Sequence, residues 1–259
     1  MTDRYWWNND LSAEGDRLRL LEAIADPRSV RILESRGVGP GWRCAELGAG
    51  AGSMAAWLAD RVGDTGSVLA VDRNLALLDH LTLRANVDLL ACHVEDLDLT
   101  AGSLDLIHTR NLLMHVEGAD DVLERLVAAL APGGVLVAEE ADYYPVAGIS
   151  SPAFGEVVRP LVSRWTWART LPATVTRLGL ADVEAEVDAP LLRGRSPEAA
   201  FWAATLASAE GRLTDPAAAS DPAVDPVSRA AFDEVQRLLA DESFWTPFAA
   251  VVCVSGRRA

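Results

Sequence analysis

The stretch AELGAGAGSM, residues 45–54, decides the fold of this chain. Three glycines at alternate positions, Gly48, Gly50 and Gly52, follow the short apolar strand pattern RCAEL (43–47) and precede apolar residues at helical spacing. Glycine adopts backbone conformations that other residues avoid, so a strand, a glycine loop and a helix in this order bring the backbone close to a ligand. The spacing alone leaves a nucleotide, a dinucleotide or a plain tight turn open.

The first 140 residues alternate between strand and helix patterns. Further strands are expected at 67–72, 87–94, 103–109 and 133–140, a helix over about 75–84, and another along an apolar stripe that ends at Leu130. Strands that alternate with helices favour parallel pairing. We therefore expect an α/β, Rossmann-like, doubly wound open sheet with its ligand crevice at the carboxyl ends of the strands.

Composition narrows the partners of the chain. Half of the 259 residues are hydrophobic, none is lysine, and 38 carboxylates against 23 basic residues give a formal net charge of −15. Such an acidic chain repels phosphate backbones, so we expect no nucleic-acid partner. Cys44, Cys92 and Cys253 lie far apart in the sequence, without metal-ligand spacing and in an odd number. Free thiols in a reducing compartment explain them best. We expect neither a leader nor a membrane segment, and a cytoplasmic protein without a membrane partner.

Three positions around the glycine loop restrict its ligand. The dinucleotide fingerprint requires a third glycine at the position that Ser53 occupies. Glu46 precedes the loop and attracts a cationic group rather than a pyrophosphate. Asp72 ends the second strand, where a carboxylate can accept both hydroxyls of a ribose. Together they favour a nucleoside with a positively charged tail that lacks phosphate.

The chain resembles the class I S-adenosylmethionine-dependent methyltransferases, in particular the small-molecule branch with ubiquinone-biosynthesis-like and bacterial natural-product enzymes. The resemblance covers residues 43–140 and rests on five stretches: AELGAGAGSMAAWLA (45–59), VLAVDRN (68–74), HVEDLDL (93–99), SLDLIHTRNLLMHV (103–116) and LAPGGVLVAEE (130–140). It implies a seven-stranded, mostly parallel sheet whose antiparallel last strand is PFAAVVCVSG (247–256), preceded by DVEAEVDAPL (182–191), and a helical substrate cap.

The resemblance implies S-adenosyl-L-methionine as cofactor and assigns its contacts. The residues are Glu46, Gly48, Ala49, Gly50, Gly52, Asp72, Arg73, Val94, Glu95, Asp96, Thr109 and Arg110. Asp72 would hold the ribose, the turn at 94–96 the adenine, and Thr109 and Arg110 would lie beside the methionine tail. His93 stands where the family often has an aspartate, which puts the adenine contact in doubt.

We expect a single methyltransferase domain over 1–259. Its cofactor-binding half is 1–140, and its cap insertions are 141–175 and 195–245, around the last strands. Residues 214–227 hold three Asp-Pro pairs and are typical of a mobile surface loop.

Methyl transfer needs alignment more than a protein nucleophile, but a base helps when the acceptor must lose a proton. His115, just after the fourth strand, is one candidate, although a histidine satisfied by a backbone carbonyl explains it as well. Tyr143 and Tyr144 follow the adjacent glutamates 139 and 140 and could act on an acceptor. No metal is expected. His108 is assigned to the core, and His80 to the periphery.

Aromatic residues indicate the acceptor. The expected pocket residues are Tyr5, Trp6, Trp165, Trp167 and Trp202, which favours an apolar or aromatic molecule, although ordinary packing explains them too. The expected reaction is O-, N- or C-methylation in secondary metabolism, and a homodimer is allowed. Alternatives are a non-methylating cyclisation or rearrangement with the same cofactor, a non-catalytic binding subunit, and an NAD-dependent dehydrogenase.

Overall fold

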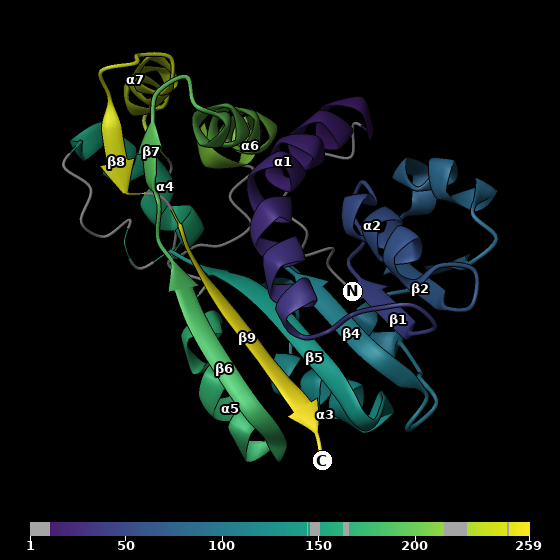
Figure 1. The fold of residues 1–259 in the computed structure, drawn as a ribbon. Coiled ribbons are helices and arrows are strands. Elements are labelled where there is room, and N and C mark those ends of the chain that lie inside the picture. Colours follow the sequence, from purple (N-terminus) through teal and green to yellow (C-terminus); the bar gives the residue numbers. More distant parts are fainter. Residues whose placement is uncertain (1–10, 144, 146–150, 163–165, 215–226, 248) are drawn as a thin grey trace. The chain divides into compact units, whose positions relative to one another are not determined.

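The computed structural model describes residues 11–143, 145, 151–162, 166–214, 227–247 and 249–259 (Figure 1). Its strands are β1 (Arg43–Leu47), β2 (Ser67–Asp72), β3 (Val87–Ala91), β4 (Leu104–Arg110), β5 (Leu130–Asp142), β6 (Leu180–Asp188), β7 (Leu191–Arg193), β8 (Trp245–Pro247) and β9 (Ala250–Arg258). Its α-helices are α1 (Leu11–Ser35), α2 (Ser53–Val62), α3 (Ala119–Ala129), α4 (Pro152–Val162), α5 (Leu171–Arg177), α6 (Pro197–Thr214) and α7 (Arg229–Leu239).

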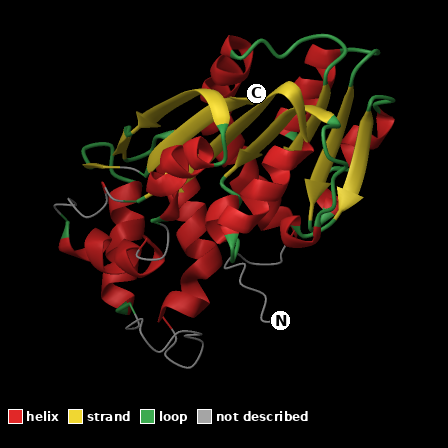
Figure 2. Ribbon diagram, turned by 90° about the horizontal axis from the view of Figure 1, so that it is seen from below, coloured by secondary structure: helices red, strands yellow, loops and turns green. Residues whose placement is uncertain are grey.

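Seven strands form one sheet in the order β3-β2-β1-β4-β5-β9-β6. The pairs β1–β2, β1–β4, β2–β3 and β4–β5 are parallel, and β9 runs antiparallel between β5 and β6 (Figure 1). Figure 2 shows the strands side by side with helices flanking them. The expected Rossmann-like, mostly parallel seven-stranded sheet is confirmed, with its antiparallel strand in the stretch expected for it.

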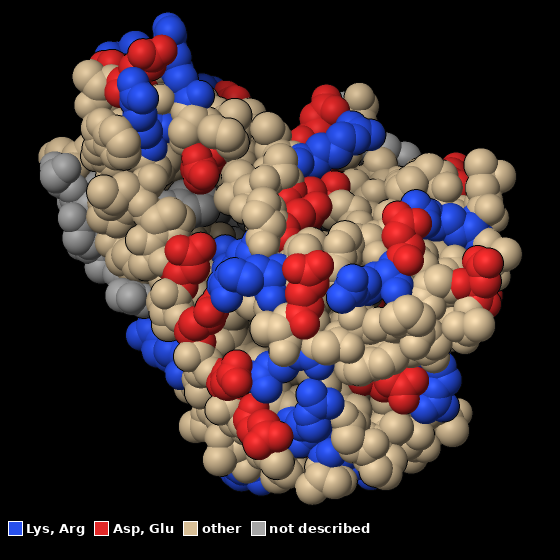
Figure 3. Space-filling view, viewed as in Figure 1, with Lys and Arg blue, Asp and Glu red and all other residues tan. Residues whose placement is uncertain are grey.

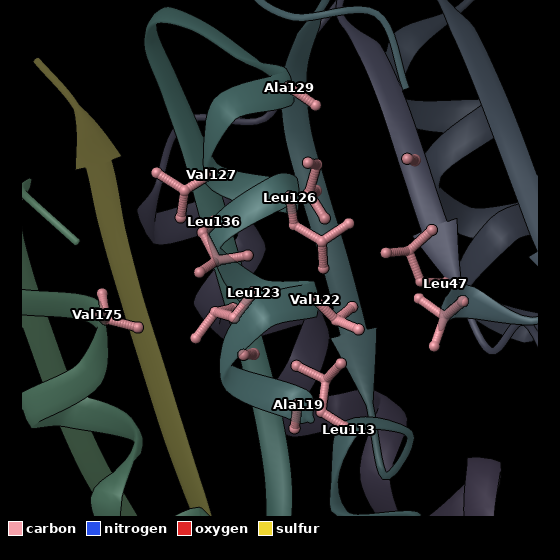
Figure 4. Close-up of a cluster of buried hydrophobic side chains, with 14 of the residues drawn as sticks. Leu47, Leu113, Ala119, Val122, Leu123, Leu126, Val127, Ala129, Leu136 and Val175 are labelled. Carbon is pink, nitrogen blue, oxygen red and sulfur yellow. The ribbon is translucent and has the colours of Figure 1, made fainter. Parts of the chain in front are cut away.

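Apolar side chains of α3 cover one face of the sheet. Val122, Leu123 and Leu126 are buried against residues of β4 and β5, among them Ile107 and Leu136 (Figure 4). Burial of each such side chain contributes roughly 1.5–3 kcal/mol. This packing fixes β4 and β5, whose carboxyl ends lead into the candidate site.

Three details of the expected elements are wrong. The strand expected at 87–94 ends at Ala91, and Val94 begins a 3-10 helix. The segment 75–84 is not one regular helix but two 3-10 helices, Leu75–Leu77 and Asp79–Leu83. Its leucines at 75, 78 and 81 recur every three residues, which matches the 3.0 residues per turn of a 3-10 helix. Leu130 does not end the preceding helix, because α3 stops at Ala129 and Leu130 pairs with Leu104 as the first residue of β5.

The chain divides into two compact units. The first comprises Met1–Ile24, Ala141–Thr166 and Asp188–Val251, and the second Ala25–Glu140, Trp167–Val187 and Val252–Ala259. The described part of the first unit contains α4, α6, α7 and the antiparallel pair β7–β8, which was not expected. Its predicted role as a substrate cap stays a prediction. The Asp-Pro segment lies almost wholly outside the described residues.

Surface charge is mixed. On the face seen in Figure 3, arginine and acidic side chains are interspersed rather than gathered by sign. Among the described helices, none combines the length and the apolar character that a membrane span requires.

Candidate functional site

The loop between β1 and α2 has the backbone that its glycines predict. Gly48, Gly50 and Gly52 have φ angles of +71°, +60° and +94°, in the left-handed region. The amides of Gly48 and Ala49 both donate to the carbonyl of Val71, at 2.8 and 3.1 Å. A Cβ at Gly52 would lie 2.9 Å from Leu78 Cδ2, so a side chain has no room there. The loop is thus fixed close to the carboxyl end of β2.

Asp72 ties the end of β2 to this loop. Its Oδ2 accepts the amide of Gly50 at 2.9 Å, and its Oδ1 accepts the amide of Asn74 at 3.0 Å. The side chain is half-buried, as is Arg73 beside it. Each carboxylate oxygen has two lone pairs, so both oxygens can accept a further hydrogen bond from a ligand hydroxyl.

The turn after β3 is a short 3-10 helix, Val94–Asp96. Val94 is buried, whereas the side chains of Glu95 and Asp96 are exposed. Arg125 of α3 donates to the carbonyl of Glu95 at 2.7 Å and holds the turn. Because β1, β2, β3 and β4 are parallel neighbours, this turn lies at the same edge of the sheet as the glycine loop.

The end of β4 contributes Thr109 and Arg110. Thr109 is fully buried, and its hydroxyl has no hydrogen-bond partner among the described residues. The guanidinium of Arg110 pairs with Asp26 at 2.9 Å and donates to Ser29 at 2.9 Å. Asp26 also accepts the hydroxyl of Ser53, the first residue of α2, at 3.1 Å. These contacts fasten α1 to the end of β4 and to the start of α2, and contact of Arg110 with a methionine tail stays a prediction.

Glu140 shapes the segment that carries His115. Its buried carboxylate accepts the backbone amides of Leu112, Leu113 and Met114 at 3.3, 3.0 and 3.1 Å. Burial raises the pKa of Glu140 to about 7, although the three amide hydrogen bonds favour its ionised form. His115 ends the 3-10 helix formed there and is half-buried. It therefore lies shortly after the carboxyl end of β4, and its role as a base stays a prediction.

His108 is buried as expected but is not an inert core residue. Its Nδ1 lies 2.6 Å from Glu46 Oε2, and its Nε2 lies 3.1 Å from Glu139 Oε1. Arg28 of α1 pairs with Glu139 Oε2 at 3.0 Å, and the thiol of Cys253 lies 3.7 Å from the same oxygen. We call Arg28, Glu139, His108 and Glu46 the buried ionic chain. It was missed because its members are 31 to 111 residues apart in neighbouring pairs.

Adjacent glutamates 139 and 140 point to opposite faces of β5, as their alternation in a strand predicts. In the described part of the chain, no three or more histidine, cysteine or acidic side chains cluster as metal ligands would.

The aromatic candidates fall in different places. In the first unit, the rings of Tyr143 and Trp202 pack edge to face with centroids 5.8 Å apart, and burial raises the pKa of the Tyr143 phenol above its usual range. In the second unit, the indole of Trp167 donates to Asp120 of α3 at 2.8 Å. The remaining candidates lie outside the described residues: Tyr5, Trp6, Tyr144 and Trp165.

Part of this chain is similar in sequence to known proteins. The family described as "Methyltransferase domain" matches residues 45–134. Methyltransferase str3 of Strobilurus tenacellus is 34% identical over 99 residues, which are 38% of this chain and 35% of that protein. The ubiquinone/menaquinone biosynthesis C-methyltransferase UbiE of Hydrogenovibrio crunogenus is 30% identical over 139 residues, 51% of this chain and 50% of that protein. The chain therefore spans half or less of the length of these relatives.

A solved structure resembles the fold over most of the chain. Phosphoethanolamine N-methyltransferase 2 of Haemonchus contortus, in complex with phosphomonomethylethanolamine and S-adenosylhomocysteine, has a TM-score of 0.55 at 19% identity. The match covers 90% of this chain and 53% of that one. At this identity the likeness concerns the fold.

Proposed function

We propose that this chain, which belongs to the class I S-adenosylmethionine-dependent methyltransferases, transfers a methyl group from S-adenosyl-L-methionine to a small organic acceptor. The observation that carries the proposal is the glycine loop: three left-handed glycines between β1 and α2, tied through Gly50 to the acid that ends β2. The loop backbone and the acid lie together at the carboxyl ends of β1 and β2, where a nucleoside without phosphate can bind.

The residues present fit this donor. Asp72 keeps lone pairs for the two ribose hydroxyls, and Val94 offers an apolar surface for the adenine ring. Glu46 places a carboxylate two residues before the loop, where it would hold the ammonium of the methionine end. The buried hydroxyl of Thr109, without a partner among the described residues, is a further polar group at this edge.

When bound, the donor supplies a methyl group on a positively charged sulfur. The protein's contribution is to align the acceptor with that group and to exclude water. We propose His115 for accepting a proton from the acceptor, and Tyr143 and Tyr144 for orienting it. Glu140 would hold the backbone beside His115 in place through its three amide hydrogen bonds.

A small, apolar or aromatic acceptor is supported by two features. Trp202 is buried beside Tyr143 in the first unit, and such rings pack well against an apolar or aromatic molecule. The relatives str3 and UbiE are named as methyltransferases, the second in quinone biosynthesis. The net charge of −15 and the interspersed charges of Figure 3 do not favour a nucleic acid. We propose O-, N- or C-methylation in secondary metabolism, in the cytoplasm, by a monomer or a homodimer.

The test is transfer of labelled methyl. The purified chain is incubated with S-adenosylmethionine labelled in its methyl group and a panel of phenols, amines and quinol-like acceptors. We expect label in a product that is heavier than its acceptor by one methyl group. A product formed without label would support the non-methylating cyclisation or rearrangement instead. Cofactor binding without any turnover over a broad panel would support a binding subunit.

A further inference from the structure

The buried ionic chain crosses four elements of the second unit. Arg28 comes from α1, Glu139 from β5, His108 from β4 and Glu46 from β1. The side chains of Glu139 and His108 are fully buried, and those of Glu46 and Arg28 are 4% and 11% exposed. Burial removes charged groups from water at a high cost in free energy, and apolar residues of similar volume often pack in such places at least as stably. Stability alone therefore does not explain the buried ionic chain.

The geometry requires an imidazolium at His108. Both ring nitrogens face carboxylate oxygens, and ionised carboxylates only accept, so both nitrogens must donate. Burial by itself lowers the pKa of His108, but the charges and hydrogen bonds of Glu46 and Glu139 outweigh it and raise the pKa to about 9. For Glu139, burial raises the pKa, but the hydrogen bond and charge of His108 and the charge of Arg28 outweigh burial and lower the pKa to about 2. Two cations thus alternate with two anions.

The buried ionic chain ends, at Glu46, beside the candidate site. Glu46 lies two residues before Gly48, at the carboxyl end of β1. His108 engages only Oε2 of Glu46, and within the described part of the chain no hydrogen bond is formed by Oε1. A glutamate has three rotatable side-chain bonds, so an unsupported Glu46 would sample several orientations. The contact with His108 selects one of them.

We propose that His108 is a positioning residue for the cofactor: it holds Glu46 through Oε2, so that Oε1 meets the ammonium group of the methionine end. Arg28 and Glu139 in turn hold His108 from its other side. The inference rests on the proposed function, because it assumes that the glycine loop binds the methyl donor. It assigns to the buried histidine of β4 a part in binding without direct contact to the ligand.

The test compares two ligands that differ at the methionine end. S-adenosylhomocysteine carries the ammonium, whereas methylthioadenosine has the same adenosine and sulfur without it. Calorimetry is done on the wild type and on His108→Gln, Glu46→Gln and the double variant. We expect His108→Gln to weaken S-adenosylhomocysteine binding about tenfold and to leave methylthioadenosine within twofold. The double variant should be no weaker than Glu46→Gln alone, because the two residues act through one contact.

Equal losses for both ligands, or no loss for either, would overturn the inference while leaving the cofactor site standing. Failure of the wild type to bind either ligand would instead remove the proposed function. If His108→Gln does not fold, nitrogen NMR of the wild type decides. At pH 8 the signals of both His108 ring nitrogens should be those of protonated nitrogens. They should shift when S-adenosylhomocysteine is added but not when methylthioadenosine is added. Unchanged signals with both ligands would contradict the proposal.

Discussion

At the scale of single residues, the acids around the loop could be predicted from sequence, whereas their partners could not. Glu46 and Asp72 stand out because an acid beside a glycine loop has a chemical reason to be there. His108 gave no such signal, since its carboxylate partners are 62 and 31 residues away. The signal that could have found it is the strand order, which places β1, β4 and β5 side by side with Glu46, His108 and Glu139 near their carboxyl ends.

Asp72→Ala should weaken S-adenosylhomocysteine binding at least tenfold, about 1.4 kcal/mol, because the ribose would lose charged hydrogen bonds and Gly50 its acceptor. Calorimetry on the folded variant measures it. Asp64→Ala, at an exposed acid before β2, is the matched control and should bind as the wild type does. An unchanged affinity in Asp72→Ala would remove Asp72 from the site.

His108 also predicts a pH dependence of stability. Its pKa is about 9 in the fold against an ordinary value of 6.5, so the folded chain holds an extra proton between these values. The stabilisation is fully present below pH 6.5 and is lost as the pH rises through 9, on the order of 3 kcal/mol in all. Urea unfolding across this range should show that the difference in free energy of unfolding between the wild type and His108→Gln becomes smaller as the pH rises. His80→Gln, at an exposed histidine, should leave the dependence of the free energy of unfolding on pH as it is in the wild type. A difference between wild type and His108→Gln that stays constant with pH would mean that His108 is neutral.

At the scale of elements, the strand and helix order could be predicted because apolar periodicity is local. The 3-10 character of 75–83 and the pair β7–β8 were missed, since three-residue strands show too little alternation to be recognised. The glycine loop was recognised because its spacing is local as well. The structure adds which glycines lack room and which only require an unusual backbone.

The two ends of α2 separate these effects. Gly52 at its start and Gly63 after its end both have positive φ, but a Cβ meets Leu78 at Gly52 and nothing within 4 Å at Gly63. Gly63→Ala should cost about 1–3 kcal/mol from backbone strain alone, because φ 66° with ψ −169° is nearly restricted to glycine. Gly52→Ala, at φ 94° and ψ 8°, should cost about 1–2 kcal/mol from strain and about 1–3 kcal/mol from overpacking against Leu78. Urea unfolding measures both, and only Gly52→Ala should also weaken S-adenosylhomocysteine binding. Unchanged S-adenosylhomocysteine binding in a folded Gly52→Ala variant would show that the loop relaxes freely around an added methyl group.

At the scale of the whole molecule, the sequence predicted the sheet, and the family match over residues 45–134 lies within it. The first unit lies largely outside that match, and its residues set the acceptor rather than the cofactor in our proposal. Acceptor recognition depends on side chains brought together from distant segments, for which no local pattern exists. The sheet is therefore predictable from sequence, whereas the residues that we propose for acceptor recognition are not.

Binding of the methyl donor's product tests the central claim most directly. Calorimetry of the purified chain with S-adenosylhomocysteine, and separately with NAD, distinguishes the two nucleotide classes that the glycine loop left open. We predict saturable binding of S-adenosylhomocysteine at one site per chain and none of NAD, because Ser53 replaces the third glycine of the dinucleotide fingerprint and the carboxylate of Glu46 before the loop disfavours a pyrophosphate. Binding of NAD without binding of S-adenosylhomocysteine would contradict the account.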